Sequence, residues 1–142
     1  MAEPADLVAG LVALLLQNAD VSAIVDQRVF GGELPAGEAE HMPRSALVVA
    51  PSGGFSLTGG SYVEHDTARV DLFGYGATQR DANTLVAVAS LAMRRIMRVV
   101  SANVLIHWAM PAGGSSSGRD AALAWPRAFQ SFQVFHALEA VS

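Results

Sequence analysis

The pattern of apolar and polar residues predicts a strand in the middle of the chain, over residues 67–74. There Val70 and Leu72 alternate with Arg69 and Asp71, which is the period of a strand with one buried face. The alternation stops at a turn that contains Gly, so we expect the strand to end at residue 74 and to lead directly into the next element.

A long amphipathic helix is predicted after that turn. The hydroxyl of Thr78 is placed to cap its first amides, and Asp81 stands where a Glu or Gln would complete a capping box. The apolar residues of this helix fall on one face: Ala82, Leu85, Val86, Ala89, Ala92, Met93, Ile96 and Met97. The strand, turn and helix contain no catalytic motif, so we interpret them as a scaffold.

The N-terminal region predicts two further helices and a polar loop. Pro4 suits the first turn of a helix whose apolar face spans residues 7–16, and a shorter helix follows over residues 21–26. The first face is wider than one small core requires, so this helix is either buried between two layers or also contacts another subunit. Residues 28–35 form a short extended piece, and residues 36–44 form a polar loop.

The strands are predicted over residues 45–50, 62–74, 104–110 and 129–138. Segments rich in Gly and Ser, near 51–61 and 111–120, are predicted to be mobile loops. The last strand places Phe129 and Phe135 on one face, opposite Phe132, Val134 and Leu138. We therefore expect both faces of the sheet to be covered, and a neighbouring subunit is one candidate for the cover.

The order of the main elements is therefore α-β-β-α-β-β. This order indicates an α+β fold, in which one mostly antiparallel sheet of about four to five strands is packed with two main helices. No internal repeat is visible in the sequence.

Composition narrows the functional classes. The chain has 142 residues and 51% hydrophobic residues, enough for one domain with a real core. A net charge of −4 gives no general attraction to nucleic acid or to an anionic membrane. All nine basic residues are Arg, and Cys is absent, which excludes lysine chemistry, disulfides and thiolate sites. The apolar run that ends near Leu16 fits neither a signal peptide nor a membrane span. We therefore expect the protein to be made and kept in a reducing cytoplasm.

One motif has the form of a catalytic site. Residues 114–118, Gly-Ser-Ser-Ser-Gly, fit the nucleophile-elbow pattern, and Asp120 and His136 follow in the order of a serine hydrolase. That pattern requires a strand running directly into the turn, whereas Pro111 and two small residues precede it here. A linker between two strands explains the same residues, so a small hydrolase using Ser116 and His136 is a distant alternative.

No metal site or general acid–base pair is predicted. Glu64, His65 and Asp66 are adjacent, but in a strand His65 points to the opposite face from the two carboxylates. His107 and His136 lie within apolar strands, where a histidine is by default a hydrogen-bonded core or interface residue. We therefore expect no catalytic residue, no metal and no cofactor.

Three arginines near the end of the central helix form the only basic cluster. Arg94, Arg95 and Arg98 are expected in its last turns, where cations interact favourably with the carbonyl end of the helix dipole. They form either a solvated helix end, or an interface to an acidic patch of another subunit or to passing nucleic acid. Together with Phe129 and Phe135 they are the candidate interface residues.

The assembled pattern resembles the tail-terminator, or tail-completion, family of long-tailed bacteriophages, prophages and gene-transfer particles. The clearest parts read Arg-Val-Phe at residues 28–30, Met-Pro at 42–43 and Arg-Val-Asp-Leu-Phe-Gly-Tyr at 69–75. The matching segments together are residues 19–30, 34–35, 42–43, 46–49, 69–75, 81–89 and 129–138. They cover nearly the whole chain, so residues 1–142 are expected to form a single domain of this kind.

The resemblance implies a structural role without an active site. Proteins of this family form a ring, usually hexameric, which caps the finished tail tube and provides the surface that joins the head connector. The implied partners are further copies of this chain, the tail tube protein and a connector or stopper protein. A membrane and specific nucleic acid are not implied, although DNA passes through such a ring. The implied location is the tail or neck of a virion, after assembly in the bacterial cytoplasm, and a connector or stopper ring on the head side is the neighbouring alternative.

Overall fold

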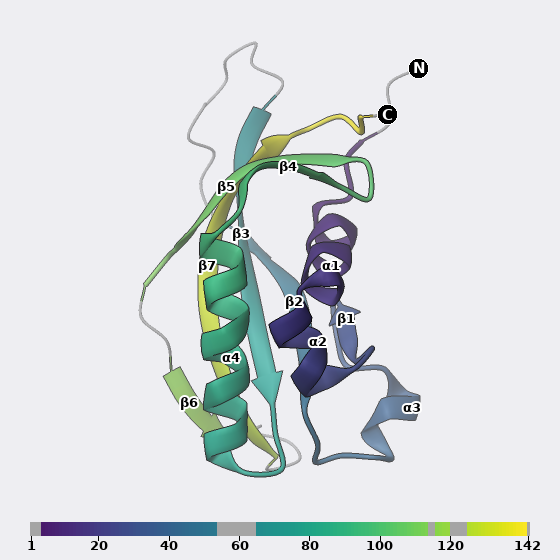
Figure 1. Cartoon of the computed structure of the whole chain (residues 1–142), viewed down its shortest axis with the longest axis vertical. Coiled ribbons are helices and arrows are strands. Elements are labelled where there is room, and N and C mark those ends of the chain that lie inside the picture. The colour runs from purple at the N-terminus through teal and green to yellow at the C-terminus, as the bar shows by residue number, and fades with distance from the viewer. Residues whose placement is uncertain (1–3, 54–64, 114–115, 120–124, 142) are drawn as a thin grey trace.

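In the computed structural model, one long, curved sheet runs the length of the molecule, and the main helices lie on one of its faces (Figure 1). The structure describes residues 4–53, 65–113, 116–119 and 125–141. The helices are α1 (Leu7–Gln17), α2 (Ala19–Val25), α3 (Ala36–Ala39) and α4 (Gln79–Arg94). The strands are β1 (Val29–Gly31), β2 (Ala46–Gly53), β3 (His65–Tyr75), β4 (Met97–Ser101), β5 (Val104–Pro111), β6 (Ser116–Arg119) and β7 (Pro126–Ala137).

The sheet confirms the α+β prediction but has more strands than expected. Its order is β1-β2-β3-β7-β5-β4, and β6 pairs with β7 beside β5. The described residues form seven strands instead of the four to five predicted, because β1, β4 and β6 are only three to five residues long. Such short strands show too few alternations to be recognised in a sequence.

Every strand pair is antiparallel except that of β1 and β2, which run parallel. Arg28 holds the start of β1 beside β2, because its Nε donates to the carbonyl of Ser45 at 2.6 Å. The amide of Leu47 in turn donates to the carbonyl of Arg28 at 2.9 Å. The Arg-Val-Phe segment therefore has a structural role in this sheet.

The central helix begins as predicted but ends earlier. The Thr78 hydroxyl accepts a hydrogen bond from the amide of Asp81 at 3.1 Å, which confirms the N-terminal cap. The helix ends at Arg94, and the next residues form β4 instead of a last helical turn. Met97, predicted on the buried face, is 85% exposed, and Arg98 has a left-handed backbone with φ of 47°. Pairing of β4 with β5 ends the helix. This is a tertiary effect, so the helical periodicity of the sequence does not reveal it.

The turn between β4 and β5 consists of two residues with left-handed backbones. Ala102 has φ of 47° and Asn103 has φ of 64°, between the paired residues Ser101 and Val104. Two consecutive positive φ values are typical of a type I′ hairpin turn, which usually carries Asn, Asp or Gly. Ala102 is therefore in a conformation that its Cβ disfavours.

The variant Ala102→Gly is expected to raise the free energy of unfolding by about 0.5–1 kcal/mol, because relief of the left-handed strain exceeds the added flexibility of the unfolded chain. Thermal unfolding of the purified protein measures the change. The matched variant Asn103→Ala is expected to lower the stability, because it introduces the same strain at the neighbouring position. A lower melting temperature for Ala102→Gly would show that the turn is not strained.

The two N-terminal helices are confirmed, with a later start for the first. Helix α1 begins at Leu7, capped by the Asp6 carboxylate, which accepts from the amide of Ala9 at 3.1 Å. Pro4 lies before the helix and forms a bridge with Glu139. No single helix in the described part is long and apolar enough to cross a membrane, and α1 and α2 meet those criteria only as a pair bent by 88°.

The wide apolar face of α1 is used within the chain. Leu7, Leu11 and Leu15 are buried, and the flanking apolar residues pack against the same core. On one flank Val8 lies so close to β1 that a Cβ on Gly31 would meet its Cγ1 at 2.8 Å. The core of the chain itself therefore covers much of this face, and a contact of α1 with another subunit stays a prediction.

Three predicted loops contain regular structure. The polar loop at 36–44 includes the short helix α3. Of the segment near 51–61, residues up to Gly53 continue β2, and the rest lies outside the described residues. Of the segment near 111–120, Pro111 ends β5 and residues 116–119 form β6 against β7, while 114–115 and 120 are not described.

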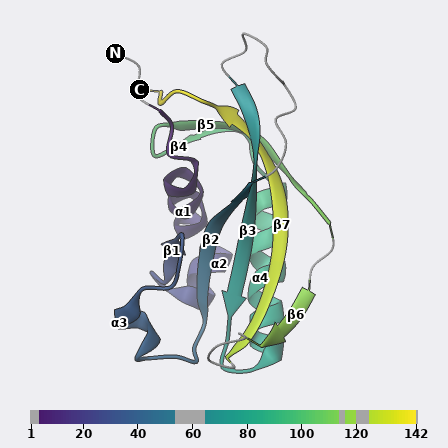
Figure 2. The same ribbon diagram turned by 180° about the vertical axis from the view of Figure 1, so that it is seen from behind.

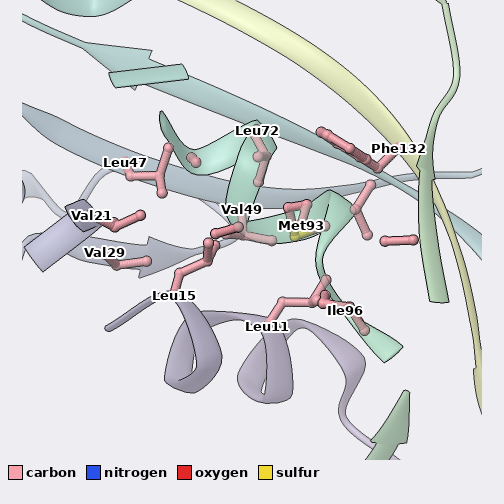
Figure 3. Packing of buried hydrophobic residues seen from close by; sticks show 14 of the residues in the cluster. Leu11, Leu15, Val21, Val29, Leu47, Val49, Leu72, Met93, Ile96 and Phe132 are labelled. Carbon is pink, nitrogen blue, oxygen red and sulfur yellow. The ribbon is translucent and has the colours of Figure 1, made fainter. Parts of the chain in front are cut away.

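The main core lies between the helices and the inner face of the sheet. Figure 3 shows Leu11 and Leu15 pointing from α1 into a cluster that includes Leu72, Met93 and Phe132. Of the residues predicted on the inner face of the last strand, Phe132 and Val134 are fully buried, but Leu138 lies beyond β7 and is 43% exposed.

A smaller cluster covers one end of the opposite face. It consists of Ala46, Val48 and Tyr75, with Phe30, Leu34, Met42, Phe73 and Trp125 packed against them. Part of the expected cover on this second face is therefore supplied by the chain itself, from the α3 region.

Candidate functional site

Ser116 and His136 do not form a catalytic pair. Ser116 lies on β6 opposite Phe129 of β7, and His136 is seven residues further along β7. Seven residues of a strand span about 23 Å, so the hydroxyl and the imidazole cannot exchange a proton directly. His136 is buried, with its Nδ1 2.8 Å from the carbonyl oxygen of Ala137, as expected for a core histidine. Asp120 lies outside the described residues.

In the described part of the chain, no three His, Asp or Glu residues are placed to hold a metal ion. Glu64 is not described, and Asp66 pairs with His136 across the β3–β7 ladder. The ring of His107 lies 5.0 Å from that of Phe135, in a contact between aromatic groups.

The three arginines of the candidate interface lie close together along the chain but in different local structures. Arg94 is the last residue of α4, Arg95 is its C-cap, and Arg98 lies on β4 instead of the predicted helix. All three are exposed, and no ion pair involves them among the described residues. The favourable position at the helix C-terminus therefore applies to Arg94 and Arg95 alone.

The same stretch exposes large apolar side chains. Leu91, Met97 and Val100 are 52%, 85% and 55% exposed. We name residues 91–100, which contain these three side chains and the three arginines, the α4–β4 junction. The sequence pattern predicts the arginines of this junction but not the exposed apolar residues among them. Only Leu91 lies off the predicted apolar face of α4, which is a pattern that indicates exposure.

Two grooves run along α4 beside the junction. One has a volume of about 630 Å³ and lies between α4 and strands β6 and β7, with Arg94 and Gln130 among its lining residues. The other has a volume of about 290 Å³ and lies between α2 and α4, lined in part by Asp20 and Arg95. Leu91 lines both grooves, so it forms a ridge between them.

Phe129 and Phe135 lie half-buried on the face of β7 opposite the core residue Phe132. Phe129 contacts Phe73 with a ring-centroid distance of 5.8 Å, and Phe135 stacks on Trp108 at 5.7 Å. Each has an aromatic partner in its own subunit. Their role as interface residues remains a prediction.

A second charged feature surrounds α3. Residues 33–41, which we name the acidic segment, contain three Glu and no Arg. Glu38 binds Arg44 through two hydrogen bonds, from Nε to Oε1 at 2.6 Å and from Nη2 to Oε2 at 2.9 Å. These hydrogen bonds from Arg44 hold the pKa of Glu38 below its ordinary value of 4.5. Glu33 and Glu40 are exposed and form no ion pair with described residues.

The Glu38–Arg44 pair predicts a pH dependence of stability. Because the folded pKa of Glu38 lies below 4.5, the pair stabilises the fold above that pH and the stabilisation is lost as pH falls below it. As the pH falls from about 5 to 3, the wild type is expected to lose the stability that it has in excess of the Glu38→Gln variant. Thermal unfolding of the wild type and Glu38→Gln across this range measures the difference in stability. Glu40→Gln is the control for loss of an exposed carboxylate that forms no ion pair with a described residue. A constant difference between wild type and Glu38→Gln would contradict the assignment.

The acidic segment and the α4–β4 junction lie in separate parts of the molecule. Figures 1 and 2 both place α3 at one lateral edge, beyond α1 and α2, and α4 and β6 toward the other. Strand β4, the second half of the junction, lies near the upper end of both views, whereas α3 lies near the lower end. A single subunit therefore carries a basic, partly apolar surface and an acidic surface in separate places.

No family model and no curated protein matches the sequence. The fold matches a chain of a solved structure described as "Virion of native gene transfer agent (GTA) particle", with a TM-score of 0.67. The match covers 92% of this chain and 94% of that chain, at 13% sequence identity. At this identity the likeness shows the fold: the α+β architecture described above is shared by a chain of that particle.

Proposed function

We propose that this protein is a structural component of a phage-like virion. We propose further that it forms a ring that terminates the tail tube and joins it to the head connector. The observation that carries the proposal is the fold match to a chain of a gene transfer agent virion, which extends over 92% of this chain. The resemblance of the sequence to tail terminators supports the specific position in the particle, since it covers nearly the same length.

Features of the subunit surface support assembly. A closed ring of identical subunits is built from heterologous contacts, in which two different surfaces of the subunit meet. The α4–β4 junction exposes Met97, Leu91 and arginines, and Met and Arg are enriched in protein interfaces. The edge strands of the sheet are β1 on one side and β4 on the other, and in the described part no further strand pairs with the outer side of either.

A connector or stopper ring on the head side is supported by the same fold match, because the description names a whole particle and not a position in it. A terminator stays on a tail that lacks a head, whereas a connector stays on a head that lacks a tail. A serine hydrolase finds no support, since Ser116 on β6 lies opposite Phe129 and therefore far from His136 on β7.

Mass measurement and negative-stain imaging of the purified protein, with and without tail tubes, test the proposal. We expect a ring of several copies, either free or formed on contact with the tube, that binds at one end of each tube. A protein that stays monomeric and never associates with tubes would contradict the proposal.

A further inference from the structure

We propose that neighbouring copies of this chain contact each other through two surfaces of opposite charge, the α4–β4 junction of one copy and the acidic segment of the next. This inference rests on the proposed ring and names the surfaces from which the ring is built.

The basic surface combines charge with exposed apolar area. Three arginines without a described ion partner lie within five residues, and three large apolar side chains lie within the same ten-residue junction. Of the five large hydrophobic residues that are exposed in the described part, Leu91, Met97 and Val100 belong to it. Apolar exposure concentrated at one place marks a surface that becomes covered in an assembly.

The acidic surface contains one internal ion pair and two carboxylates available for pairing. The ion pair of Glu38 with Arg44 ties α3 to the chain that leads into β2. With Glu38 occupied, Glu33 and Glu40 remain exposed on either side of α3 and can accept hydrogen bonds from guanidinium groups of another molecule.

The placement of the two surfaces fits a head-to-tail contact. They are separated along the long axis of the subunit, with β4 near the upper end and α3 near the lower end of Figures 1 and 2, so pairing one with the other leaves a free surface of each kind. Repetition of such a contact extends a chain of subunits, and the chain closes when the rotation between neighbours allows it. A two-fold dimer would instead need one surface that is complementary to itself.

A second copy fits the basic surface better than nucleic acid does. Contacts to a phosphate backbone use charge and hydrogen bonds, and they leave no role for exposed Met97 and Val100. The net charge of −4 also opposes general attraction to a polyanion.

Charge exchange between the two surfaces tests the inference. One variant carries Arg94→Glu and Arg95→Glu, so that both of its surfaces are acidic. A second carries Glu33→Arg and Glu40→Arg, so that both are basic. All four residues are exposed, so both variants should fold. The first is expected to melt at a slightly lower temperature than the wild type, because two cations at the C-terminal end of α4 become anions. Thermal unfolding of each variant shows that the subunit is folded. Each variant alone is expected to assemble at least about tenfold more weakly than the wild type, because like charges meet at every contact.

A mixture of the two variants is expected to regain assembly. In an alternating ring each acidic junction meets a basic segment, and each basic junction meets an acidic segment. The control variant carries Arg80→Glu and Glu139→Arg, two exposed reversals outside both surfaces, and should assemble as the wild type does. Analytical ultracentrifugation at fixed ionic strength measures the assembly of the two variants, their mixture and the control, each compared with the wild type.

The results separate this inference from the proposed function. Variants that assemble like the wild type, or a mixture that assembles no better than its components, would overturn the pairing of these surfaces while the wild-type ring stands. A wild-type protein that forms no ring, alone or on tail tubes, would contradict both.

Discussion

The variant Leu85→Ala is expected to unfold with a free energy about 2–5 kcal/mol lower than that of the wild type. Leu85 is fully buried on the face of α4 that packs against the sheet. Its Cγ lies only 3.5 Å from the position that a Cβ on Gly74 would occupy, so helix and strand are in close contact there. Truncation removes apolar contacts and leaves a cavity that this close packing cannot easily fill.

Leu91→Ala provides the matched control for that prediction. It removes the same atoms from the same helix, but Leu91 is 52% exposed, so a loss below about 1 kcal/mol is expected. Urea unfolding followed by circular dichroism gives both values, at concentrations where the subunit is monomeric, because assembly adds to apparent stability. Equal losses for the two variants would mean that α4 does not pack on the sheet through the predicted face.

The variant Gly76→Ala is expected to lower the free energy of unfolding by about 1–3 kcal/mol. A Cβ at this position would lie 2.6 Å from the backbone nitrogen of Ala82 and 2.9 Å from the carbonyl carbon of Asp81. Both atoms belong to the first turn of α4, which the Thr78 cap holds in place. Relief of the overlap must therefore move the start of the helix away from the end of β3.

Gly118→Ala is the matched control, since a Cβ at Gly118 would have no neighbour within 4 Å. It should leave the stability nearly unchanged, and thermal unfolding measures both variants. If Gly76→Ala were as stable as the wild type, the close approach of the turn to α4 would be wrong.

The parts of the fold that could be predicted from the sequence are those with a long pattern. Helix α4 and strands β3 and β7 each carry enough buried residues at regular spacing to identify the element and its inner face. The end of α4 could not be predicted, because Ile96 continues the helical spacing and is indeed buried, although it lies beyond the helix. Its burial comes from the path of the chain into β4, which depends on pairing with β5.

The surface features were predictable only in part. Arg94 and Arg95 could be placed at the end of α4 from their spacing, and the structure keeps them exposed there. Exposure of Met97 could not be predicted, since an apolar residue in phase with a buried face is ordinarily buried. Helix α3, within the acidic segment, falls in the predicted polar loop of residues 36–44, because a helix of four residues has no periodic pattern.

The central claim is that this protein belongs at the head-proximal end of a tail. Immunogold labelling of particles assembled without heads, and of particles assembled without tails, tests it most directly. We predict label at one end of free tails and none on tailless heads. Label on tailless heads with none on free tails would contradict the claim and identify a head-side connector, and label on neither would remove the protein from the neck.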